Sequence, residues 1–318
     1  MSRARDIIQE IAKVRQRQSS NYAMAELSTR LFALERAFKP YEALDSELKK
    51  YFPVALIACI EGHCRLAIKN LVDAGEPYLT NAEKLIGQTK LDFSVLRAVH
   101  GRSVSVGEII SHVIPLSRLE HINSAFSSLL GRNFLDDIRI TYNRWAHEVN
   151  GQPKEPILKY PDAVFSDVQR TFELRHIICH ELATAYEING DEIARCFENC
   201  LLFVRATDEL VSNTLHPGAP LTQTEMNISA AQSLRDTKNK MDMAEADLKE
   251  RLSPVDLAAF EKSQKMWAEY CEAWAEFHAG PIEGSGTIRP LLYARTAEAA
   301  TERRTEELLA YRQLWEKS

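Results

Sequence analysis

The sequence has no apolar run long enough to span a membrane, few glycines and prolines, and no low-complexity tract. Its longest apolar run, PVALIACI at residues 53–60, is far shorter than the ~20 residues that a spanning helix needs. The first eighteen residues, MSRARDIIQEIAKVRQRQ, place charges among their apolar positions and show no secretory signal. Twelve glycines and twelve prolines in 318 residues argue against an extensively disordered chain. These absences predict a folded protein of the cytoplasm with no membrane contact.

A regular cysteine framework is also missing. The six cysteines stand inside apolar helical segments, at Cys59, Cys64, Cys179, Cys196, Cys200 and Cys271. In a reducing compartment we expect such residues to be small buried hydrophobic groups and not disulfide partners.

The chain has no excess of positive charge. Its formal net charge is −6, and residues 221–318 carry 13 basic and 17 acidic side chains. The remaining residues carry 26 basic and 28 acidic side chains. Bulk electrostatic binding of nucleic acid is therefore excluded, and any such contact must come from a local cluster.

Helical periodicity runs through almost the whole chain, and no stretch alternates with a period of two, so we predict an all-α fold. Residues 1–40 carry 8 basic and 4 acidic side chains in two amphipathic stripes. We expect this arm to be a helix pair packed on the body of the protein, with RNA or partner contact as the alternative.

The remaining predicted elements follow from apolar spacing and from Pro, Gly and Asn signals. Helices are expected over residues 51–75, 81–86, 93–100, 106–113, 119–130, 135–146, 162–185 and 192–215, with a loop over 149–161. Asp191 can cap the helix after INGD. The segment HPGAP at residues 216–220 marks a domain boundary, and three long helices follow over 226–251, 256–278 and 289–315.

The octapeptide LRHIICHE at residues 174–181 combines Arg175, His176 and His180 with apolar neighbours. His176 and His180 are four residues apart and share a helix face. Arg175 and His180 are five apart, about 140° around the axis, so a single ideal helix does not bring them together. Arg175 could still converge with His180 if it lies near a helix end or reaches across with its long side chain. A paired second copy of the helix could also supply the missing half of a site.

Three interpretations of the octapeptide remain open at this point. The histidines could hydrogen-bond to neighbouring helices while Arg175 lies on the surface. They could bind a metal together with Cys196 and Cys200, which repeat the same four-residue spacing. Finally, an imidazole could move protons to and from RNA while a guanidinium holds the scissile phosphate. That last pair suffices for metal-free strand cleavage that leaves a 2′,3′-cyclic phosphate.

The run RHIICH resembles the Arg-x(4–6)-His signature of HEPN domains, including the polar residue directly after the arginine. YFPVALIACIEGHCR at residues 51–65 is similar to the opening helix of HEPN branches from bacterial conflict systems. The resemblance covers about residues 41–215. It implies a helical bundle that forms a homodimer, in which two copies of the motif face each other across a cleft. Many HEPN proteins are metal-independent endoribonucleases of toxin–antitoxin, abortive-infection or anti-phage systems, acting on tRNA or mRNA loops.

Carried over to this chain, the resemblance implies that Arg175 is the phosphate clamp, His180 the general base or acid, and His176 an auxiliary polar residue. It implies no metal and no cofactor, while an antitoxin or regulatory partner is typical of the family. The resemblance does not cover Glu173 and Glu181, which could orient a histidine but are better explained as solvated charges on a helix. Additional residues that could line an RNA path are Arg65, Lys69 and Arg170, and these too could be ordinary solvated charges.

Residues 221–314 resemble the lysozyme-inhibitor LprI-like domain through an opening helix, KSQKMWAEYCEAWAEF, the turn GSGTIRP and a closing TERRTEEL helix. Secreted members carry paired cysteines, whereas Cys271 stands alone here, which fits a cytoplasmic version and a sensor or interaction role. Trp267, Tyr270, Trp274 and Phe277 recur at helical spacing, and we expect them to form the core of a helical hairpin, with a ligand-facing aromatic stripe as the alternative.

The predicted organisation is therefore a helical arm over residues 1–40, a HEPN-like helical bundle over 41–216 and a smaller LprI-like three-helix domain over 221–318.

Overall fold

The computed structural model describes residues 3–17, 23–40, 45–86, 97, 99–101, 104–181, 186–187, 189–281 and 286–315. The chain divides into two compact units, Met1–Pro217 (unit 1) and Gly218–Ser318 (unit 2), so the division falls inside the HPGAP segment. Apart from an isolated bridge between Tyr142 and Pro156, the described residues form helices, turns and loops without a strand. The all-α prediction is confirmed.

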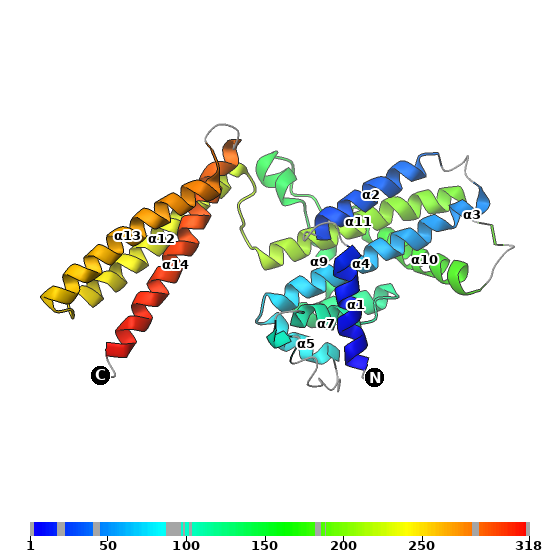
Figure 1. Ribbon diagram of the computed structural model, residues 1–318. Helices are drawn as coiled ribbons and strands as arrows, with labels where there is room; N and C mark the ends of the chain where they lie inside the picture. Colours follow the sequence, from blue (N-terminus) through cyan, green and yellow to red (C-terminus); the bar gives the residue numbers. More distant parts are fainter. Residues whose placement is uncertain are drawn as a thin grey trace. The chain divides into compact units, whose positions relative to one another are not determined.

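Unit 1 begins with two arm helices, continues with a long central helix and ends with a pair of long helices (Figure 1). Its helices are α1 Arg3–Arg17, α2 Ala23–Phe38, α3 Ser46–Lys49, α4 Tyr51–Asp73, α5 Tyr78–Ile86, α7 Val106–Val113, α8 Leu119–Leu130, α9 Phe134–Ile140, α10 Pro161–His180 and α11 Gly190–Leu215, with a π-helix at Trp145–Val149. The helix predicted over 93–100 and the last residues of the one predicted over 162–185 lie largely outside the described residues.

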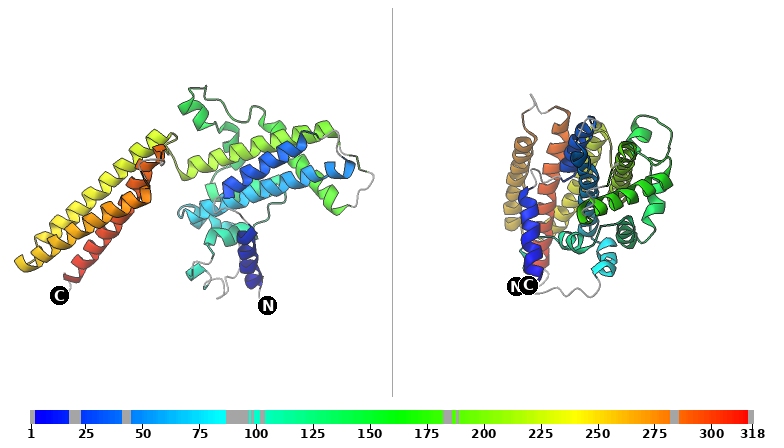
Figure 2. Two further views of the ribbon diagram at one scale, coloured as in Figure 1. Left: turned by 45° about the horizontal axis from the view of Figure 1, so that its top comes forward. Right: turned by 90° about the vertical axis from the view of Figure 1, so that its right-hand side faces the viewer.

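The α4 helix is the centre of unit 1, with α2, α7, α10 and α11 packed around it (Figures 1 and 2). Within the described part of the chain, the segment Glu47–Asp73 is the one helical stretch long and apolar enough to cross a membrane. However, 61% of its most apolar window is buried inside unit 1, as expected for the core helix of a globular domain. Its apolar character is therefore explained by packing on several sides.

The two arm helices pack on this body through apolar side chains. Leu34 of α2 is buried, and the Phe38 ring stacks on Phe197 with centroids 5.1 Å apart. On α1, Ile11 is buried against Val104 and Ile109. The arm is thus part of unit 1.

Two predicted helix ends differ from the structure. The α9 helix ends at Ile140 and does not continue to residue 146, because the Ile157 amide donates to the Thr141 carbonyl and ties the following segment to the 149–161 loop. The α11 helix is capped by Asn189, whose side-chain oxygen accepts hydrogen bonds from the Asp191 (2.9 Å) and Glu192 (3.4 Å) amides, so the prediction that Asp191 is the cap is wrong.

Gly107 is the point of closest approach between α4 and α7. A Cβ atom at this position would overlap the Lys69 carbonyl oxygen and lie 2.7 Å from Oδ1 of Asp73. The Asp73 carboxylate itself accepts hydrogen bonds from the Gly107 amide (2.8 Å) and the Ser105 hydroxyl (2.7 Å). The absence of a side chain at Gly107 therefore allows the two helices to meet.

We expect Gly107→Ala to lower the free energy of unfolding by about 1–3 kcal/mol, because backbone atoms must move to admit the methyl group. Gly62→Ala is the matched control, since a Cβ there meets nothing within 4 Å and alanine is the better helix former. Urea unfolding followed by circular dichroism compares the two variants. Equal stability of both variants would show that the α4–α7 contact tolerates expansion.

Unit 2 contains α12 Gln223–Lys249, α13 Pro254–Ala279, a 3₁₀ turn at Gly286–Ile288 and α14 Arg289–Trp315 (Figure 2). Thr222 forms a capping box with Glu225 at the start of α12, and Ser253 caps α13 with Pro254 in the first turn. Both α12 and α13 pack on α14. One part of the core between them is lined by small residues: Ala230, Cys271, Ala275, Ala294, Ala297 and Ala300.

The aromatic residues of α13 do not all lie in this core. Trp267 packs against both apolar clusters of unit 2, as predicted. In contrast, Tyr270 is 56% exposed and Phe277 75% exposed, while Trp274 is half-buried. The prediction of a wholly internal aromatic stripe is wrong because the core side of this half of α13 consists of Cys271, Ala275 and Ala279.

Candidate functional site

The last two turns of α10 carry the residues of the octapeptide. Upstream of them, the buried Asp167 carboxylate holds α10 against α11 by accepting hydrogen bonds from Arg195 (3.0 Å) and Asn199. One turn later, the buried Thr171 hydroxyl donates to the Asp167 carbonyl. These contacts fix the direction in which α10 presents its C-terminal residues.

His176 and His180 lie side by side at the end of α10. Their ring centroids are 5.1 Å apart with the planes tilted by 45°, and both side chains are exposed. Arg175 is partly exposed, and its guanidinium makes no hydrogen bond or ion pair with any residue that the structure describes. Two imidazoles and an uncommitted cation are therefore accessible together at one end of unit 1.

In contrast to Arg175, Arg170 on the same helix has a guanidinium that is fully engaged with neighbouring side chains. Its guanidinium contacts Glu192 (2.7 Å), the Tyr186 hydroxyl (2.7 Å) and Glu173 (3.1 Å). The hydrogen bond to Glu192, followed by that to Glu173, raises the pKa of Arg170 above its usual range. Because Tyr186 and Glu192 follow the octapeptide in sequence, Arg170 braces the chain where it returns from α10 to α11.

The other two basic residues proposed for an RNA path are engaged elsewhere. Arg65 donates to backbone carbonyls at the end of α7, including His112 (3.4 Å) and Ser111, and Lys69 pairs with Asp73 at 3.1 Å. The end of α10 lies at the same end of unit 1 as the start of α4, whereas α7 lies along the second half of α4 (Figure 1). The structure therefore does not bring Arg65 and Lys69 to Arg175 and His180.

Neither acidic neighbour fixes a histidine ring. Glu173 pairs with Arg170, and the Glu181 carboxylate lies 3.9 Å from Nε2 of His176, beyond hydrogen-bond distance. Among the described residues, the His180 ring contacts the His176 ring. The first interpretation of the octapeptide requires hydrogen bonds from neighbouring helices to both histidines. Among the described residues, neither histidine has one.

The four-ligand metal set is not assembled. Cys196 and Cys200 are buried beneath α10, with exposed fractions of 0% and 1%, while both histidines point to the surface. Burial raises the pKa of Cys200 to about 12, which disfavours the thiolate that a metal requires. No cluster of three or more potential metal ligands occurs among the described side chains.

The expectation of buried cysteines holds for five of the six and fails for Cys179. This residue is exposed because it lies one position before His180, at the end of α10, where the helix leaves the core. The exposure of Cys179 does not alter the description of His176 and His180 as an exposed pair.

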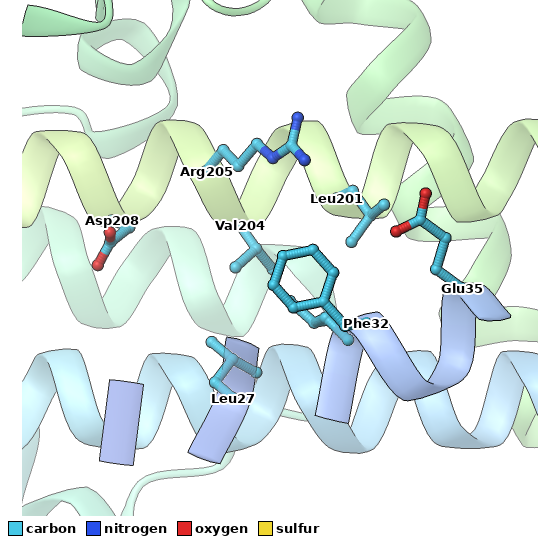
Figure 3. A pocket seen from close by; sticks show the side chains of 8 residues that line it. Leu27, Phe32, Glu35, Leu201, Val204, Arg205 and Asp208 are labelled. Carbon is cyan, nitrogen blue, oxygen red and sulfur yellow. The ribbon is translucent and has the colours of Figure 1, made fainter. Parts of the chain in front are cut away.

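Sequence reasoning did not find a groove of about 140 Å³ between α2 and α11 (Figure 3). Its lining is largely apolar, with charged groups at the rim: Leu27, Leu31, Phe32, Glu35, Leu201, Val204, Arg205 and Asp208. Burial raises the pKa of Asp208 above its usual value, helped by the adjacent Glu209. The one sequence signal for this groove is Phe32, a large apolar residue that lies between two inward-facing leucines and is exposed in the structure. The groove offers no imidazole, thiol or hydroxyl for covalent chemistry.

Comparison with known proteins identifies one region. Residues 217–308 match the family model described as Lysozyme inhibitor LprI, which confirms the LprI-like assignment of the C-terminal part. No curated protein and no solved structure matches the chain. The HEPN resemblance of unit 1 stays a prediction from its sequence motif.

Proposed function

We propose that unit 1 is a metal-independent endoribonuclease whose site is the end of α10. One observation carries the proposal: His176 and His180 are exposed at 5.1 Å from each other beside Arg175, an arginine without a partner among the described residues. An uncompensated guanidinium next to two imidazoles, which can accept and donate protons, suits a phosphodiester substrate. Arg170 is a poor clamp in comparison, because its donors are already occupied.

In the proposed reaction, His180 acts on one side of the phosphate and His176 assists. A general base takes the proton of a ribose 2′-hydroxyl, whose oxygen attacks the adjacent phosphorus. The bond from phosphorus to the 5′-oxygen breaks, and a general acid returns a proton to that leaving oxygen. The products are a 2′,3′-cyclic phosphate and a free 5′-hydroxyl. Arg175 stabilises the negative charge that develops on the phosphoryl oxygens.

We propose that the active form is a homodimer. Because Arg175 and His180 are separated by about 140° on an ideal helix, one copy presents only part of the set to a given phosphate. A second α10 end supplies the complementary group. With Arg65, Lys69 and Arg170 engaged within the chain, the local positive charge is small. A loop of tRNA or mRNA with splayed bases therefore suits the site better than a long duplex.

For unit 2 we propose an interaction or sensor module that controls unit 1, in a toxin-like or anti-phage defence role. The family match supports a protein-binding role, while the single Cys271, buried and unpaired, separates this chain from members with paired cysteines. Free cysteines and the burial of α4 within unit 1 favour the cytoplasm. An antitoxin or other regulatory partner would keep such an enzyme silent until needed. The alternative is a non-catalytic helical interaction protein.

The proposal is tested by incubating the purified chain with total cellular RNA in the presence of EDTA and sequencing the new RNA ends. We expect discrete cuts that leave cyclic phosphate at the 3′ side and hydroxyl at the 5′ side. The absence of new ends in any RNA pool, with the chain folded, would support the non-catalytic alternative. Cleavage that disappears with EDTA would contradict the metal-free mechanism.

A further inference from the structure

The groove between α2 and α11 contains one residue that interrupts an apolar pattern. Leu201, Val204 and Asp208 are three and four residues apart, so they share one face of α11. Leu27 and Leu31 of α2 line the other side of the groove (Figure 3). Asp208 therefore places a carboxylate at the end of a strip that is otherwise apolar.

The Asp208 carboxylate is half-buried and has no hydrogen bond or ion pair with a described residue. Burial is the main reason that its pKa is raised, and the adjacent Glu209 adds to the effect. Glu209 itself accepts a hydrogen bond from the Arg144 amide at 3.1 Å. A carboxylate that is partly removed from water gains from a cation at hydrogen-bond distance. Asp208 therefore favours a ligand that brings a positive charge.

The other two charged residues of the rim leave Asp208 alone at its end of the groove. Glu35 stands at the opposite end, and Arg205 extends along α11 away from Asp208 (Figure 3). Within the part of the chain that the structure describes, no ion pair joins any two of these three side chains. The rim thus carries two carboxylates and one guanidinium, so its charge favours a cationic ligand over an anionic one.

The groove has room for one compact apolar group. Its volume of about 140 Å³ is close to the ~150 Å³ of an apolar protein cavity that binds benzene. Phe32 is 68% exposed and forms part of the wall, where its ring can stack on a second ring. A partner helix inserts several side chains along a binding groove, so this volume suits a small molecule better.

We propose that the groove binds a small primary amine that carries one aromatic ring or one branched aliphatic group. The apolar part of the ligand lies between Leu31 and Val204, with Phe32 against it. Its ammonium group donates to the Asp208 carboxylate. Aromatic and branched amino acids yield amines of this class by loss of CO₂. The inference does not depend on RNA cleavage, because no residue of the groove belongs to the site at the end of α10.

Ligand-observed NMR titration of the full chain with phenethylamine tests this inference. Phenylacetate presents the same ring with a negative charge, and ethylamine presents the ammonium group without the ring. The variant Asp208→Asn removes the charge and keeps the shape of the side chain. Its matched control is Asp242→Asn, because Asp242 is exposed in unit 2. A second variant, Phe32→Ser, removes the exposed ring from the wall of the groove.

We expect wild type to bind phenethylamine with a Kd of about 1 mM, which a ligand of about nine non-hydrogen atoms can reach. Asp208→Asn should bind it about 10- to 100-fold more weakly, since a hydrogen bond to a charged group is lost. Phe32→Ser should bind it about 2- to 10-fold more weakly. Asp242→Asn should stay within about twofold of wild type. Phenylacetate and ethylamine should each bind at least ~10-fold more weakly than phenethylamine.

Equal affinity of wild type and Asp208→Asn for phenethylamine would overturn the role of Asp208 as the cation-binding group. Equal binding of phenethylamine and phenylacetate would overturn the cationic character of the ligand. Equal binding of phenethylamine and ethylamine would overturn the apolar subsite. If wild type shows no binding at about 10 mM phenethylamine, the inference as a whole fails. RNA cleavage is measured separately and is not affected by these outcomes.

Discussion

Replacing His180 with alanine is expected to lower the rate of RNA cleavage about 100- to 10,000-fold, the range typical for loss of a general acid or base. The loss should appear in kcat and leave the fold unchanged, because the imidazole is exposed and bonded to no described neighbour. Quantitative cleavage of one mapped RNA site, with thermal unfolding measured in parallel, gives both values. His176→Ala should cost less, in keeping with an auxiliary role.

His216→Ala is the matched control for this prediction, since it removes another exposed imidazole at the opposite end of α11. It should cleave at the wild-type rate. A similar decrease for His180→Ala and His216→Ala would mean that general loss of charge, and not a site at the end of α10, explains the effect.

Acid should destabilise unit 1 through His63. This residue lies within α4 at 2% exposure, and neither ring nitrogen has a hydrogen-bond partner. Burial lowers the pKa of His63 from 6.5 to about 4, because the charged imidazolium is poorly solvated in the core. The neutral form therefore predominates in the folded protein at pH values where the unfolded chain already binds a proton.

The sign of the pH effect follows from this difference. Below about pH 6.5 the unfolded state gains the proton first, so stability falls until the folded pKa near 4 is reached. A difference of 2.5 between the two pKa values corresponds to about 3 kcal/mol at pH 4. Urea unfolding of wild type and His63→Leu at pH 7 and pH 4 isolates the contribution.

His63→Leu should lose about 3 kcal/mol less than wild type between the two pH values, since it removes the titrating group from the core. His121→Leu is the comparison, because His121 is only partly buried and its ring contacts the Ser117 hydroxyl at 3.3 Å. An unchanged acid response in His63→Leu would assign the loss to other groups.

Much of unit 1 could be predicted because the segments with the clearest helical spacing of apolar residues are the helices that pack in the core. The predicted helices over 106–113 and 119–130 agree with α7 and α8 in both bounds. The helix predicted over 135–146 was too long, since its end is decided by a contact between Thr141 and Ile157 that spacing along the chain does not encode. Local signals determined the helices, and tertiary contacts determined some of their ends.

The candidate site could be predicted only in part for a related reason. From the sequence, Arg170 and Arg175 are equally basic residues of one helix. Only the structure shows that Glu192 and Tyr186 fold back onto Arg170, while Arg175 has no described partner. Likewise, the spacing of Tyr270 and Phe277 places them on one face of α13 without saying that alanines occupy the core side. Charge pairing and the choice of inward face depend on neighbours distant in sequence.

The most direct test of a site shared between two α10 ends is subunit mixing of Arg175→Ala with His180→Ala. Each variant alone should be nearly inactive. If one copy supplies Arg175 and the other supplies His180, half of the dimers in an equal mixture are mixed and half of their sites are complete. Cleavage should therefore return to about a quarter of the wild-type rate. A mixture that exchanges subunits and stays as inactive as either variant, while wild type cleaves RNA, would contradict the account.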